Sequence, residues 1–60
     1  MIVEIVAKEG TLATIESGAG PASVPREGET VAFHGKVAGV VERVTWNFTS
    51  LGLMVEVKIA

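Results

Sequence analysis

The fold is decided by one stretch, residues 24–44, which reads VPREGETVAFHGKVAGVVERV. It predicts a turn, a short strand over residues 30–34, a second turn, and a long strand over residues 37–49. Pro25 and Gly28 indicate the first turn, because proline fixes φ and glycine accepts a positive φ. Gly35 and Lys36 indicate the second turn, and the valines that follow are typical of a β core. The stretch predicts a small closed β-barrel, and it does not indicate any particular catalytic or binding chemistry.

Outside this stretch the sequence predicts three more strands, over residues 2–8, 11–16 and 53–59. Turns at residues 9–10 and 50–52 separate them from their neighbours, and the small residues 17–23 predict a surface connector. Leu12 and Ile15 are the expected apolar anchors of the second strand. The last strand alternates cleanly, and its expected inward residues are Leu53, Val55, Val57 and Ile59.

Glu42 interrupts the apolar alternation of the long strand. Strict alternation would place it on one face with Val40, Val44, Trp46 and Phe48. A β-bulge at residues 41–43 would instead turn Val41 inward and Glu42 outward. We therefore expect a bulge or sharp bend there.

These elements predict one domain, residues 1–60, with an all-β fold. The preferred architecture is a five-stranded antiparallel small barrel, because closing the sheet removes exposed edges. The alternative is an open antiparallel sheet paired across a dimer.

Composition limits the partners and the chemistry. The net charge is −2, and five basic residues are scattered among seven acidic ones, which argues against a nucleic-acid partner. With one histidine, no cysteine and no aspartate, we expect no metal site and no cofactor. No apolar run is long enough to span a membrane. The absence of cysteine fits a cytoplasmic protein.

Hydrophobic residues make up 48% of the chain, more than so small a barrel has room to bury. This surplus predicts a homo-oligomer or a protein partner. The expected oligomer interface comprises Ile2, Val6, Leu51 and Met54. Trp46 fits either a core plug, which we favour, or an interface anchor.

The two turns of the opening stretch also carry polar side chains that geometry and packing do not require. The candidate interaction residues are Arg26, Glu27, His34, Lys36 and Glu42. Histidine is a common general base, but the sequence pairs His34 with no nucleophile and no orienting carboxylate. We expect no catalytic site and no enzyme activity.

The spacing of Gly28, Val31, Gly35, Gly39, Val41 and Val44 resembles the rhythm of SH3-like barrels, including KOW and Tudor-type modules. That resemblance implies an SH3-like fold and no particular function. Residues 24–31 and 40–46 also resemble a group of short uncharacterised proteins of phages and mobile elements. These share a Val-Pro-Arg-x-Gly-Glu start and a Val-x-x-Val-x-Trp strand.

The second resemblance implies a small β-barrel-like accessory protein. Together with the lack of a catalytic constellation and the surplus of apolar residues, it favours a non-enzymatic accessory or protein-interaction module that self-associates. One alternative is a nucleic-acid-binding small barrel, which requires the basic residues to gather on one face. Another is a ligand-binding or enzymatic site at the pore of an oligomer.

Overall fold

The computed structural model of the chain describes residues 1–16, 18 and 24–60; most of the predicted connector 17–23 lies outside the described residues. Its elements are five strands and no helix within those ranges. They are β1 (Ile2–Ala7), β2 (Gly10–Glu16), β3 (Thr30–Phe33), β4 (Lys36–Thr49) and β5 (Gly52–Ile59). The five predicted strands are confirmed, each with one end shifted by one residue.

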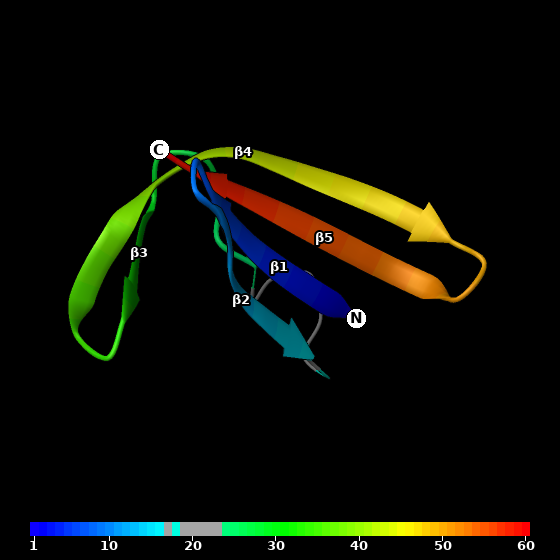
Figure 1. Cartoon of the computed structure of the whole chain (residues 1–60). Helices are drawn as coiled ribbons and strands as arrows, with labels where there is room; N and C mark the ends of the chain where they lie inside the picture. Colours follow the sequence, from blue (N-terminus) through cyan, green and yellow to red (C-terminus); the bar gives the residue numbers. More distant parts are fainter. Residues whose placement is uncertain (17, 19–23) are drawn as a thin grey trace.

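The strands form one curled sheet in the order β2-β1-β5-β4-β3 (Figure 1). Neighbours pair antiparallel except β1 and β5, which run parallel from Ile2 opposite Met54 to Val6 opposite Lys58. The expected fully antiparallel sheet is therefore wrong at this pair. The sheet is mixed, because the connection between the β1–β2 hairpin and the β3–β5 meander places the first and last strands in the same direction.

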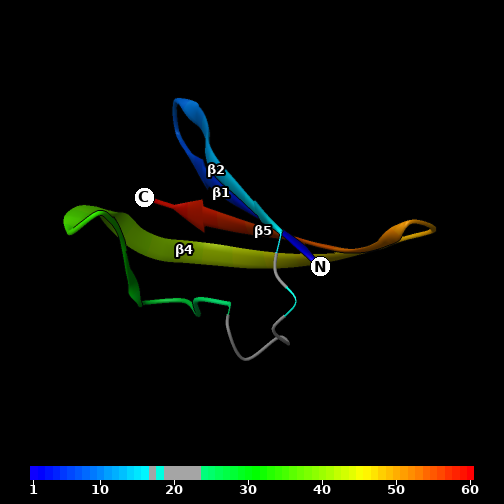
Figure 2. The same ribbon diagram turned by 90° about the horizontal axis from the view of Figure 1, so that it is seen from below.

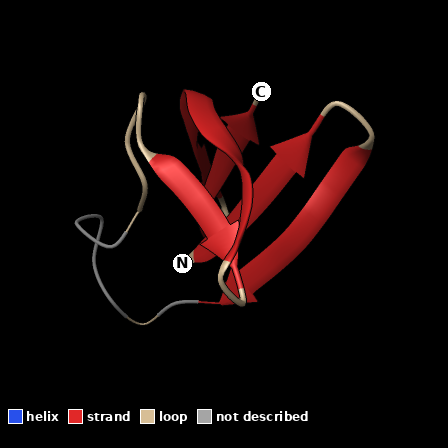
Figure 3. Cartoon of the chain, turned by 90° about the vertical axis from the view of Figure 1, so that its left-hand side faces the viewer, coloured by secondary structure: helices blue, strands red, loops and turns tan. Residues whose placement is uncertain are grey.

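The sheet curls into a half-barrel, as the view from below and the side view show (Figures 2 and 3). Its outer strands, β2 and β3, do not pair with one another within the described residues, so the predicted closed barrel is not seen. The all-β class is confirmed, and the SH3-like assignment stays a prediction.

One face of the curled sheet holds the core. Val3 and Ile5 of β1 lie opposite Val55 and Val57 of β5, and all four are buried. The other members of the buried cluster are Ala7, Val24, Val31, Val41 and Ile59. The predicted inward face of the last strand is thus confirmed, with Leu53 packing at its margin.

Two sequence expectations about the core are wrong. Leu12 and Ile15 of β2 are exposed. Leu12 has no cross-strand partner, because Ile5 pairs with Ala13 and Val6 with Thr11, and Ile15 lies opposite Val3 outside the buried cluster. Trp46 shares the core face with Val55, yet it remains 40% exposed and lies outside the buried cluster. It is therefore not the core plug that its size suggested.

The predicted bulge in β4 is confirmed. Val41 lies opposite Ile59 and Arg43 opposite Lys58, so Glu42 is the extra residue between two paired positions. Val41 is buried and Glu42 is exposed, as the alternation required. The bulge lets one strand serve two partners, since β4 pairs with β3 before it and with β5 after it.

The β3–β4 hairpin turns one residue earlier than expected, at His34 and Gly35. Both have positive φ, 51° and 80°, and Phe33 pairs with Lys36 across a two-residue loop. Two consecutive positive φ values are the mark of a type I′ turn, whose twist matches that of the flanking strands. His34 therefore occupies a left-handed position that most side chains avoid.

The first turn of the opening stretch spans residues 26–29, where the Glu29 amide donates to the Arg26 carbonyl at 3.1 Å. Gly28, with φ of 86°, takes the positive-φ position as predicted. Pro25 precedes the turn and is not its second residue, which corrects the expected geometry. The Arg26 amide in turn donates to the Glu29 carboxylate and closes the loop on itself.

Candidate functional site

The five candidate interaction residues divide between two places. The Gly28 amide donates to the Val41 carbonyl at 2.9 Å, and the Val41 amide to the Glu29 carbonyl at 2.8 Å. These bonds hold the turn that carries Arg26 and Glu27 against β4, one residue before Glu42. His34 and Lys36 lie at the opposite end of the β3–β4 hairpin. The sequence alone did not separate these two groups.

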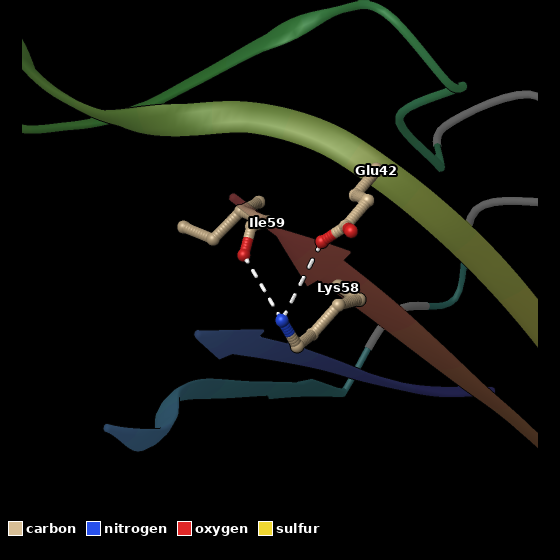
Figure 4. A network of polar contacts seen from close by, with 3 residues as sticks. All are labelled: Glu42, Lys58 and Ile59. Carbon is tan, nitrogen blue, oxygen red and sulfur yellow. Dashed lines mark hydrogen bonds and ion pairs between the residues drawn. The ribbon is translucent and has the colours of Figure 1, made fainter. Parts of the chain in front are cut away.

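Glu42 makes the one ion pair found among the described side chains. Its Oε2 lies 3.5 Å from Nζ of Lys58, which also donates to the Ile59 carbonyl at 3.5 Å (Figure 4). The Glu42 side chain is 58% exposed, and pairs this accessible to water contribute about 0–1 kcal/mol. The contact fixes the outward direction of the bulge and provides no binding pocket.

His34 is exposed at the tip of its hairpin. Within the described ranges it has no hydrogen bond and no ion pair with another side chain. A general base needs such a partner to hold its ring toward a substrate. Its position is explained by turn geometry.

The outer face of the sheet carries a row of polar residues. Glu4 of β1 lies directly opposite Glu56 of β5, and Thr14 and Thr45 extend the row on either side. Both carboxylates line a shallow polar hollow. No third acidic or histidine side chain joins them to make a metal-binding group in the part of the chain that the structure describes.

The most exposed apolar surface is the far half of the β4–β5 hairpin. We call residues 44–55 the apolar arm; they include the Ser50–Leu51 turn and contain no charged side chain. The β1 ladder ends at Ile2 opposite Met54, so the tip of the arm extends beyond β1 (Figure 1). Its tip therefore has no neighbouring strand on the β1 side.

Two aromatic side chains and one leucine dominate this arm. Phe48 is 80% exposed and Leu51 is 98% exposed, and Trp46 adds its exposed edge. Trp46 and Phe48 lie opposite Val55 and Leu53, so both aromatics are on the core-facing side of the sheet. The core face thus continues into an uncovered strip of large apolar residues.

Hydrogen bonds of the Thr49 side chain close the turn of the arm. The Thr49 hydroxyl donates to the Gly52 carbonyl at 2.8 Å and accepts from the Leu51 amide at 3.2 Å. Gly52 has φ of 129°, a conformation that other residues adopt with strain. The exposed Leu51 is therefore presented by an ordered turn.

The expected oligomer interface is brought together only in part. Ile2 pairs with Met54 on the outer face, and both line, together with Leu51, an open hollow of about 390 Å³ between the tip of the arm and the start of β1. Val6 lies farther along β1, opposite Lys58, and does not line this hollow.

Phe48 is the residue that sequence reasoning missed. The signal was present, because residues 44–55 are free of charge in a chain whose charged fraction is 20%. A hairpin that exposes both faces needs charge for solubility unless a partner covers it. The absence of charge over residues 44–55 is therefore the sequence signal by which the arm, and Phe48 within it, could have been found.

Comparison with protein-family models, curated proteins and solved structures returned no match for the chain. Residues 1–16, 18 and 24–60, which the structure describes, contain no helix that is long and apolar enough to cross a membrane.

Proposed function

We propose that this protein is a non-enzymatic accessory or interaction module that associates with further copies of itself through the apolar arm. The observation that carries the proposal is the exposure of Trp46, Phe48 and Leu51 on a charge-free hairpin. Large aromatic and aliphatic side chains supply most of the binding energy of protein interfaces. The resemblance to short phage and mobile-element proteins supports an accessory role in the cytoplasm.

Self-association is favoured over a charged partner by the distribution of charge. Two identical surfaces meet without electrostatic repulsion only where they carry no net charge or carry both signs. The arm carries none, whereas the chain as a whole has a net charge of −2. A contact through the arm keeps the charged parts of both copies apart.

Sedimentation velocity over a concentration series from about 5 to 200 µM tests the proposal. We expect the weight-average sedimentation coefficient to rise with concentration, because an interface near the lower size limit gives reversible association. The double variant Phe48→Ser/Leu51→Ser is expected to sediment as a monomer throughout. A wild-type chain that remains monomeric at 200 µM contradicts the proposal.

Val37→Ser is the matched control. Val37 is 71% exposed near the tip of the other hairpin, so it tests loss of exposed apolar surface as such. We expect it to associate like the wild type. If Val37→Ser abolishes association as fully as the double variant does, the arm is not the contact surface.

The nucleic-acid alternative required the basic side chains to gather on one face. Arg43 and Lys58 are direct cross-strand neighbours, and Lys58 is paired with Glu42. The other three, Lys8, Arg26 and Lys36, lie at or beside three separate turns. Binding to the phosphates of a nucleic-acid backbone requires clustered cations, so this scattered arrangement gives the nucleic-acid alternative little support.

A further inference from the structure

We infer that two copies pair through the outer edge of β4, residues 43–49, as antiparallel strands around a two-fold axis at Trp46. The inference rests on the proposed self-association and specifies its geometry. It joins the two half-barrels into one continuous sheet.

The first observation is an unpaired strand edge. β3 pairs with β4 only between Lys36 and Val40, and the backbone bonds from residues 28, 29 and 60 reach only Val40 and Val41. From residue 43 to residue 49, β4 pairs with β5 on one side, and no described residue pairs with it on the other. An open strand edge is a template for another strand.

The second observation is the lack of any protective device on this edge. Natural edges are blocked by proline, lysine, a short length or a bulge. The bulge of β4 lies before the free edge, and Arg43 is the sole charge, at its beginning. The six residues that follow are uncharged and contain no proline. By contrast, the free edge of β3 is only four residues long.

One register uses the whole free edge. A two-fold axis perpendicular to the sheet places residues of the same face opposite one another. Centred on Trp46, it pairs residues 43–49 with themselves in reverse order. Val44 then meets Phe48 of the second copy, Thr45 meets Asn47, and Trp46 meets Trp46. Apolar side chains oppose apolar ones, polar oppose polar, and no like charges face each other.

The area is sufficient for a small specific interface. From their exposed fractions, Trp46 and Phe48 together present on the order of 250 Å² per chain. In two copies the aromatics therefore present roughly 500 Å² in total, which is an upper bound for their contribution to the buried area. The backbone edges, Val44, Thr45 and Asn47 bring the total toward the ~1,000 Å² of the smallest specific interfaces.

Single cysteines test the register directly, because the chain has no cysteine of its own. Trp46→Cys is expected to give a disulfide-linked dimer under oxidised glutathione, since directly opposite Cα atoms lie about 4.5–5.5 Å apart. Thr45→Cys alone is expected to stay uncross-linked, because the two copies of residue 45 lie about 8 Å apart. An equimolar mixture of Thr45→Cys and Asn47→Cys is expected to form a disulfide-linked mixed dimer, because these two positions lie opposite one another in the proposed register. Both variants retain Trp46.

Ile15→Cys is the control for the other long free edge. Ile15 lies on β2 and is 45% exposed, close to the exposure of Trp46. Suppose that the wild-type chain sediments as a dimer, that Ile15→Cys cross-links, and that the β4 cysteines do not. This result overturns the β4 register and leaves the proposed self-association standing. The same holds for a dimer in which no β4 cysteine cross-links.

A monomeric wild-type chain at 200 µM overturns both proposals. Binding of that monomer to phosphatidylcholine vesicles, followed by Trp46 fluorescence, would assign the arm to a lipid surface. Circular dichroism of each cysteine variant establishes that it retains the wild-type fold.

Discussion

Gly39 lies where β4 approaches the end of β5 most closely. A Cβ at this position would be 2.6 Å from the carbonyl oxygen of Ala60, and the Ala60 amide donates to the Val40 carbonyl at 3.0 Å. The absence of a side chain at residue 39 therefore lets the strand cross the chain end. Its role is close packing, since its φ needs no glycine.

Gly39→Ala is expected to lower the free energy of unfolding by about 1–3 kcal/mol, because the added methyl group overlaps backbone. Urea denaturation measures the change. Gly18→Ala is the control, since a Cβ there meets nothing within 4 Å. Removing Ala60 should relieve part of the penalty in Gly39→Ala; an equal penalty with and without Ala60 would place the clash elsewhere.

Ile59 and Leu51 are the extremes of burial among the large aliphatic residues. Ile59 is fully buried between β1 and β4, and Leu51 is almost fully exposed. Ile59→Ala is expected to cost about 2–5 kcal/mol, because it removes contacts and leaves a cavity. Leu51→Ala is expected to change the free energy of unfolding by less than about 0.5 kcal/mol at low micromolar concentration. Equal losses in urea denaturation would contradict the position of the core.

β4 carries one inserted residue, Glu42, at the point where its pairing with β5 begins. Without Glu42, Val41 and Val44 would still point inward, because Arg43 alone would stand between them. Deletion of Glu42 is therefore expected to preserve the core faces while removing the extra twist at residues 41–43. The variant should fold with reduced stability, as measured by circular dichroism and thermal unfolding.

Deletion of Thr45 is the matched control. It shifts the residues between the bulge and the turn by one position and exchanges the two faces of that part of β4. We expect the Thr45 deletion to lose the cooperative transition that the Glu42 deletion keeps. A Glu42 deletion that is as disruptive as the Thr45 deletion would show that the bulge is needed for folding.

The local elements were predictable from the sequence because their signals are local. Alternation in residues 53–59 gave the inward face of β5, and the position of Glu42 gave the bulge. Gly28 gave a positive-φ position and Gly35 marked the second turn, although that turn is formed with His34 and not with Lys36. The parallel pairing of β1 with β5 was missed, since strand direction across about fifty residues leaves no mark in either strand.

The candidate site was predictable in part for the same reason. Ile2, Met54 and Leu51 were identified from their apolar character at outward or turn positions. Trp46 was favoured as a core plug because of its size, but the core ends before it reaches this residue. Phe48 was placed only on a strand face by alternation and was not identified as a site residue. How far a face is covered depends on the length of the neighbouring strand, here β1, which stops opposite Met54.

For the whole molecule, the charge-free arm makes a prediction about salt. Association through uncharged surface is expected to change less than about threefold in dissociation constant between 50 and 500 mM NaCl, because screening acts on charges. Sodium sulfate at the same ionic strength is expected to strengthen it, since sulfate favours apolar burial. Sedimentation equilibrium measures both. A tenfold weakening in NaCl would assign the contact to the charged outer face.

The parallel pairing of β1 with β5 also divides the molecule into two parts. The two parts are the β1–β2 hairpin and the β3–β5 meander, and each is built from strands adjacent in sequence. In the described residues, they are joined by a single ladder, which runs from Ile2–Met54 to Val6–Lys58. Cutting the chain between residues 16 and 24 leaves all of the described strand pairs intact. The protein is thus a natural candidate for fragment complementation, in which two separate peptides reconstitute one sheet.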